Sequence, residues 1–60
     1  MPESERECSI LQFLRTHGDT HVNDIADGLD LALGDVLEDL MSLELDGYVE
    51  SLFGKQYRAL

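Results

Sequence analysis

Histidine, cysteine and aspartate side chains, the residue types that bind metals or act as nucleophiles, occur together early in the chain. His17 and His21 flank Asp19, and Cys8 lies nine residues before His17. A structural metal site needs about four such ligands held in fixed geometry. This set crosses a turn, and the thiol lies beside acidic residues with no base to activate it. The sequence therefore predicts no metal, no cofactor and no enzymatic activity.

The basic side chains are few and lie near the two ends of the sequence. Thirteen Asp and Glu against four Lys and Arg give a net charge of −9, and residues 16–54 contain no Lys or Arg. DNA binding is driven largely by cations that release counterions from phosphates, so this charge disfavours nucleic acid as a partner. Lys55 and Arg58 are the one weak candidate pair for phosphate contact.

The length and the cysteine count bound the kind of protein. Sixty residues support one thin core, and a single cysteine cannot form an internal disulfide. The apolar runs are much shorter than the roughly 20 residues that span a bilayer, and no signal peptide is recognisable. We expect one cytoplasmic domain over residues 1–60, with residues 1–4 as a disordered tail.

Capping residues and glycines place the first two helices. Ser4 followed by Glu7 fits a capping box, which predicts a helix over residues 5–16 that ends near Gly18. Residues 20–22 favour a short extended segment, and Asn23 is expected to be the N-cap of a second helix that runs to residue 29. Asp30 is expected to adopt left-handed backbone angles in the following turn.

The remaining sequence predicts a third helix and a hairpin. The helix is expected over residues 33–46, with Gly47 as its stop, and residues 48–52 and 56–57 favour strands joined by a bend at 53–55. The fold class is mainly α with a small β-hairpin, a winged helix-turn-helix of three helices and a two-stranded wing. In such folds the third helix lies in the major groove of DNA.

Two apolar stripes run along the third helix. The first is expected to form the core with residues of the other elements, in the set Leu33, Val36, Leu40, Leu43, Ile10, Phe13, Leu14, Ile25 and Leu31. The second stripe consists of Leu37, Met41 and Leu45, and the remaining face is acidic, with Asp35, Glu38, Asp39, Ser42 and Asp46. Carboxylates on that face would meet the field of the phosphates without a compensating cation.

Three interpretations of the second stripe remain open. The chain's own wing or N-terminal tail covers it, which predicts a monomer. Alternatively, Leu37, Met41 and Leu45 form a protein-binding surface for a second copy, another domain of a parent chain or a different protein. In the third interpretation the acidic face imitates DNA toward a basic partner, although a solvated face or adaptation to high salt explains the same charges.

The end of the chain resembles a known family. Leu43-Glu44-Leu45-Asp46-Gly47-Tyr48-Val49 followed by a wing that closes with Tyr57-Arg58 is similar to the C-terminal winged-helix domain of DNA-processing protein A (Smf), as are residues 22–26 and the pattern Val36-x3-Leu40-x2-Leu43. The resemblance implies an accessory module for DNA uptake and natural transformation that acts by protein contact. The alternative is a winged-helix DNA-binding transcriptional regulator that uses its wing and third helix.

Overall fold

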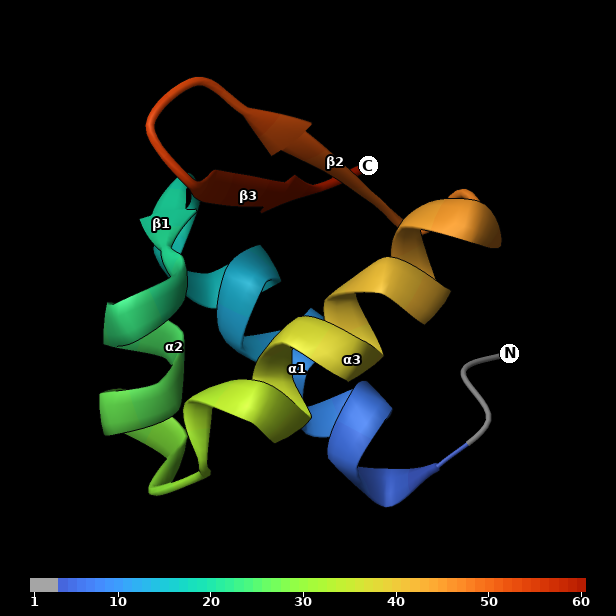
Figure 1. The fold of residues 1–60 in the computed structure, drawn as a ribbon. Coiled ribbons are helices and arrows are strands. Elements are labelled where there is room, and N and C mark those ends of the chain that lie inside the picture. Colours follow the sequence, from blue (N-terminus) through green and yellow to red (C-terminus); the bar gives the residue numbers. More distant parts are fainter. Residues whose placement is uncertain (1–3) are drawn as a thin grey trace.

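Three helices and a three-stranded sheet make up the structure (Figure 1), a computed structural model that describes residues 4–60. The elements are α1 (Glu5–His17), β1 (Thr20–His21), α2 (Val22–Leu29), α3 (Leu33–Leu45), β2 (Val49–Leu52) and β3 (Gln56–Ala59). The predicted winged-helix fold is confirmed. The predicted tail, residues 1–4, lies outside the described residues except for Ser4.

The ends of α1 follow the predicted capping. The Ser4 hydroxyl accepts a hydrogen bond from the backbone N–H of Glu7 at 3.1 Å. At the other end Gly18 has φ +76° and donates its N–H to the carbonyl oxygen of Leu14 at 2.8 Å. Glycine adopts this positive φ without a steric penalty, so the chain leaves the helix there.

The start of α2 differs from the prediction. His21, not Asn23, is the N-cap, because the His21 Nδ1 accepts the backbone N–H of Asn23 at 3.0 Å. The imidazole thus takes the role that a short polar side chain usually has at this position. At the other end Asp30 has φ 55° and ψ 47°, the left-handed conformation expected for it.

β3 is the central strand of the sheet. The strand order is β1-β3-β2, both pairings are antiparallel, and Thr20 faces Tyr57 while Leu52 faces Gln56. The short segment expected to be extended therefore adds a third strand to the predicted two-stranded wing. The turn between β2 and β3 ends at Lys55, whose carbonyl oxygen accepts the N–H of Val22 at 3.1 Å. This bond attaches the tip of the wing to the start of α2.

The core lies where α1, α2, α3 and the sheet meet. Val36, Leu40 and Leu43 are all 0% exposed, as expected for the first stripe of α3. Leu33 was assigned to the core, but it is 42% exposed. It lies one turn before Leu37 and shares the outer edge of the helix with it. The buried residues that the sequence patterns missed are Leu11, Val22, Ala26 and Val49.

An ion pair joins the start of α1 to α3. Arg6 Nη2 lies 3.0 Å from Asp39 Oδ1, and Arg6 Nη1 lies 3.4 Å from Asp35 Oδ2. The hydrogen bond to the Asp39 carboxylate raises the pKa of Arg6 above its already high ordinary value. Asp39 is only 4% exposed, so this arginine compensates a buried carboxylate.

Within residues 4–60, no helix is long and apolar enough to cross a membrane.

Candidate functional site

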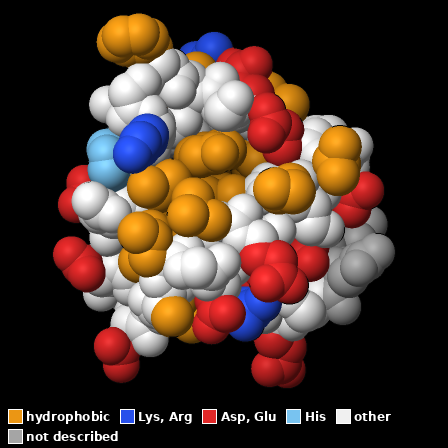
Figure 2. Space-filling model, in the orientation of Figure 1, with side chains coloured by type: hydrophobic (Ala, Val, Ile, Leu, Met, Phe, Trp, Pro, Cys, Tyr) orange, Lys and Arg blue, Asp and Glu red, His pale blue; other side chains and the backbone are white. Residues whose placement is uncertain are grey.

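The second stripe of α3 lies at the surface. Leu37 is 43% exposed, Met41 65% and Leu45 82%, so neither the wing nor any other part of residues 4–60 covers them. Figure 2 shows hydrophobic side chains gathered over α3 between the wing and α2, with acidic side chains around them. The wing does not cover this stripe, because the sheet packs against the first stripe of the helix through buried Val49. The N-terminal tail, the other cover considered, lies outside the described residues except for Ser4.

Leu37, at one end of this stripe, forms part of the floor of a concave site of about 370 Å³. Three elements meet there, namely the start of α2, the outer edge of α3 and the wing. The lining residues are His21, Val22, Asn23, Leu33, Leu37, Lys55 and Tyr57. The site therefore combines an apolar floor, one aromatic ring and a polar side near the wing and the start of α2.

The polar residues of the concave site can supply hydrogen-bond donors. The His21 Nδ1 accepts a hydrogen bond from Asn23 N–H, so the neutral ring carries its hydrogen on Nε2. The Lys55 side chain is exposed, and no ion pair is recorded for it within residues 4–60. An ammonium group, an imidazole N–H and the Asn23 amide together suit an anionic ligand such as a phosphate group.

The two basic residues predicted for phosphate contact separate in the structure. Lys55 lines the concave site. Arg58 follows Tyr57 on β3, and because successive strand residues point to opposite faces, it lies on the other side of the sheet. There it forms an ion pair with Glu50, the residue opposite it on β2. Arg58 is therefore not part of the concave site.

The acidic face of α3 is less negative toward solvent than its composition indicates. Asp39 is buried, and both Asp35 and Asp39 are paired with Arg6. Of the five polar positions assigned to that face, Glu38 and Asp46 are exposed carboxylates without such pairing in the described part of the chain. The net charge of the whole chain is thus a poor measure of the potential at the concave site.

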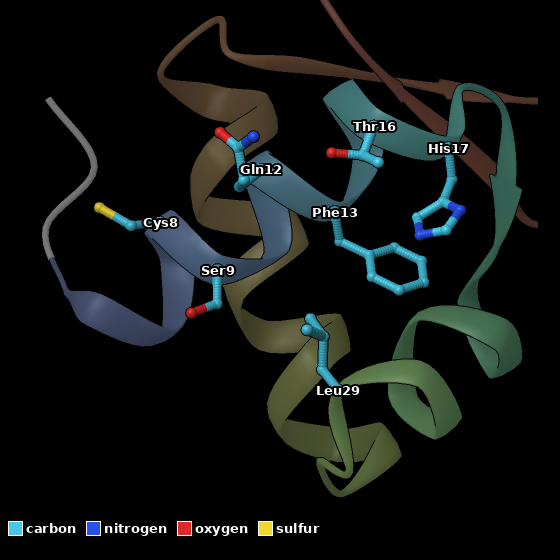
Figure 3. Close-up of a pocket in the computed structure, with 7 residues that line it drawn as sticks. All are labelled: Cys8, Ser9, Gln12, Phe13, Thr16, His17 and Leu29. Atoms are coloured by element: carbon cyan, nitrogen blue, oxygen red, sulfur yellow. The ribbon is translucent and has the colours of Figure 1, made fainter.

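A larger, shallower hollow of about 530 Å³ lies between α1 and α2 (Figure 3). The Phe13 and His17 rings lie against each other there, with centroids 4.2 Å apart and an interplanar angle of 36°, whereas Cys8 points away from them. This hollow has no Lys or Arg in its lining. The residues weighed as metal ligands do not converge, since His17 packs against Phe13 and His21 caps α2, and residues 4–60 contain no cluster that could hold a metal ion.

Sequence reasoning missed most of the concave site. Leu37 was singled out as an exposed site residue, and Lys55 as a phosphate contact. Tyr57 was assigned only to a strand, Leu33 to the core, and His21 and Asn23 to local structure. The available signal was the strand period, which places Tyr57 and Lys55 on one face of β3 and its turn. Met41 and Leu45 continue the stripe beyond the lining residues.

The fold of the chain was compared with known proteins. No family model and no curated protein sequence matches it. A Zalpha domain of PKZ, solved in complex with ds(CG)6, superposes with a TM-score of 0.89 at 30% identity, covering 93% of this chain and 100% of that one. The ORF112 Zalpha domain of Cyprinid Herpesvirus 3, solved for its binding mode to Z-DNA, has a TM-score of 0.88 at 24% identity over 98% of this chain and 100% of that one. The Zalpha domain of PKZ from Carassius auratus, in complex with Z-DNA, has a TM-score of 0.88 at 24% identity over 93% of this chain and 94% of that one.

These comparisons overturn two predictions. The resemblance to DNA-processing protein A, and with it the implied role in natural transformation, is wrong, because the structural neighbours are Zalpha domains. The matched spacing Val36-x3-Leu40-x2-Leu43 is explained by the buried edge of α3 that winged helices share. The expectation that charge disfavours nucleic acid as a partner is contradicted as well, because these neighbours are solved with DNA.

Proposed function

The chain belongs to the family of Zalpha domains, and from that membership we propose that it binds double-stranded DNA of alternating C and G in the left-handed Z form. It acts as a binding module and not as an enzyme. The observation that carries the proposal is the match over the full length of a Zalpha domain solved with ds(CG)6. The concave site between α2, α3 and the wing supports it, because these are the elements through which winged helices meet DNA.

The lining residues divide into two kinds of contact. We assign the phosphate contacts, which orient the duplex without selecting sequence, to Lys55 with the His21 Nε2–H and the Asn23 amide, because all three line the same hollow. Tyr57 and Leu37 offer an aromatic ring and an apolar side chain to sugars or base edges. In this division the polar side of the site orients the duplex, and the floor of the site distinguishes one kind of duplex from another.

The small number of cations limits how the DNA is recognised. With Lys55 as the one basic residue in the lining, the phosphate contribution corresponds to about one released counterion. A site with so little charge cannot hold any duplex tightly by electrostatics alone. Selection must then depend on the shape of the double helix, and handedness is the largest difference in shape that a duplex offers.

Titration with a CG-repeat duplex tests the proposal. Because the circular dichroism spectrum of such DNA inverts when the duplex becomes left-handed, addition of the protein at low salt is expected to invert it. A mixed-sequence duplex of equal length serves as the control, and its spectrum is expected to stay unchanged. Anisotropy measured at several salt concentrations should give a slope of log K against log salt of about −1.

Two results would overturn the proposal. One is the absence of binding to the CG-repeat duplex at low salt, and the other is equal affinity for the mixed-sequence duplex without spectral inversion. A steep salt dependence, with a slope near −5 or beyond, would contradict the assignment of Lys55 as the main phosphate contact.

The role of Leu37, Met41 and Leu45 as a protein-binding surface stays a prediction. Met41 and Leu45 are the most exposed residues of the stripe, and they lie outside the lining of the concave site. Sedimentation of the domain over a range of concentrations tests this prediction. Met41→Asp should then weaken any self-association without unfolding the domain, because the side chain is already 65% exposed.

A further inference from the structure

The tip of the wing presents an aromatic ring to solvent. Phe53 is 100% exposed, more than any other large hydrophobic residue among residues 4–60. Single exposed apolar side chains are common on protein surfaces. This one is fully exposed, so the fold does not depend on it. The side chain therefore makes no contribution to the core, and its position is set only by the turn that carries it.

That turn is held in one conformation from both sides. It connects paired Leu52 and Gln56, and it contains two consecutive residues with positive φ, Gly54 at +80° and Lys55 at +61°. A lysine rarely adopts such angles, and the Lys55 carbonyl oxygen accepts a hydrogen bond from Val22 N–H. The turn that carries Phe53 is thus tied to the start of α2 as well as to the two strands.

The turn also lies next to the concave site. Lys55 lines that site, and Phe53 comes two residues earlier in the same turn. Figure 1 shows this turn between β2 and β3, next to β1. A duplex seated on α3 and contacted by Lys55 would therefore extend toward the phenyl ring. Phenylalanine has no hydrogen-bonding group, so its contact with a nucleic acid would be stacking on the face of a base.

We propose that Phe53 is a stacking site for an unpaired nucleobase next to the bound duplex, with Lys55 on the adjoining phosphate. A base inside a paired stack is covered on both faces, whereas an unpaired base has a face free for an aromatic ring. Every base has such a face, so this site does not select among bases. The inference rests on the proposed binding of CG-repeat duplex DNA and adds the kind of site on that DNA that the domain prefers.

Two CG-repeat duplexes test the inference. One is fully paired, and the other carries a single unpaired 2-aminopurine at its centre, whose fluorescence falls when it stacks. The wild-type domain should bind the second duplex at least about fivefold more tightly and quench its fluorescence. Phe53→Ala should remove both effects and leave affinity for the paired duplex unchanged, while Phe53→Trp should keep them.

The controls separate the possible failures. Because the Phe53 side chain is fully exposed, Phe53→Ala should leave the melting temperature unchanged, and Leu60→Ala, at 66% exposure, is the matched variant away from the wing tip. Equal binding of the two duplexes by the wild type, or an unchanged preference in Phe53→Ala, overturns the inference alone. Failure of the wild type to bind the paired duplex overturns the proposed function. Self-association that Phe53→Ala removes would assign the ring to a protein contact and also overturn the inference.

Discussion

The two edges of α3 have the same kind of side chain in opposite environments. On the inner edge Val36, Leu40 and Leu43 are completely buried against α1, α2 and the sheet. On the outer edge Leu37 and Met41 are 43% and 65% exposed, although both are as apolar as their buried neighbours. Folding explains why the inner edge is apolar, whereas much of the outer edge stays uncovered by the rest of residues 4–60 and is accessible to a ligand.

Spacing alone does not distinguish these edges. Both follow the helical period, and together they form an arc too wide for one helix to bury against its neighbours in a domain of this size. What separates them is the position of the other elements, since α1 and α2 meet α3 on one side only. The lesson is that surplus apolar surface on a helix is better treated as a candidate binding surface than assigned to the core.

The largest difference between the edges should be in stability. Leu40→Ala removes a fully buried side chain and leaves a cavity, so it is expected to lower the free energy of unfolding by about 2–5 kcal/mol. Leu37→Ala, already 43% exposed before truncation, should cost less than about 1 kcal/mol. Urea denaturation of the two variants measures both values. Equal losses would mean that the outer edge is part of the core.

The second largest effect on stability should come from removing the ion pair beside the inner edge of α3. Arg6→Ala leaves the buried Asp39 carboxylate without its cation, so the melting temperature should fall clearly. Arg58→Ala breaks a pair whose side chains are 50% and 41% exposed, and its effect should be much smaller. Thermal melting of both variants gives the comparison. A larger loss from Arg58→Ala would show that Asp39 does not depend on Arg6.

On the outer edge the main effect should be on DNA binding. Leu37→Glu places a carboxylate on the floor of the concave site, where it would face phosphates, and should weaken binding of the CG-repeat duplex by at least about tenfold. Leu45→Glu adds the same charge to the same helix edge outside the lining, so it is the matched control. Anisotropy titrations at one salt concentration measure both. Similar losses would indicate that only net charge matters.

The smallest effect is expected at the wing. Lys55→Asn removes the charge but keeps a residue that tolerates the positive φ of this position. The slope of log K against log salt should become shallower by about 0.9, while the melting temperature stays close to that of the wild type. Lys55→Arg should keep the salt slope. An unchanged slope in the Asn variant would remove Lys55 from the phosphate contacts.

Local structure was predictable because its causes lie within a few residues. Ser4, Gly18 and Asp30 act on their own turns, and the bounds of the helices follow within one residue except at the start of α2, which begins two residues earlier than expected. The exception is the N-cap of α2, where the imidazole of His21 replaces the expected Asn23. Short polar side chains are the common caps, so a histidine in this role gives no separate signal in the sequence.

The candidate site was only partly predictable because three separate segments build it. Leu37 and Lys55 were recognised individually, but nothing in their spacing shows that they face each other across a hollow. The assignment of Leu33 to the core failed for the same reason, since the helical period places it between Leu40 of the first stripe and Leu37 of the second and does not show which side the other elements cover. The net charge was the most misleading signal, because Arg6 pairs with Asp35 and Asp39 from a distant part of the sequence.

The order of strands in the sheet has a consequence for how the chain folds during synthesis. β3 lies between β1 and β2 and pairs with both, and it comes last in the sequence of the three. Neither outer strand has a partner until Gln56–Ala59 has left the ribosome. The helices can form while translation proceeds, but the wing and the hydrogen bond from Val22 to Lys55 must wait until β3 has emerged. The nascent domain therefore completes its concave site after its helices, because Lys55 and Tyr57 belong to the lining.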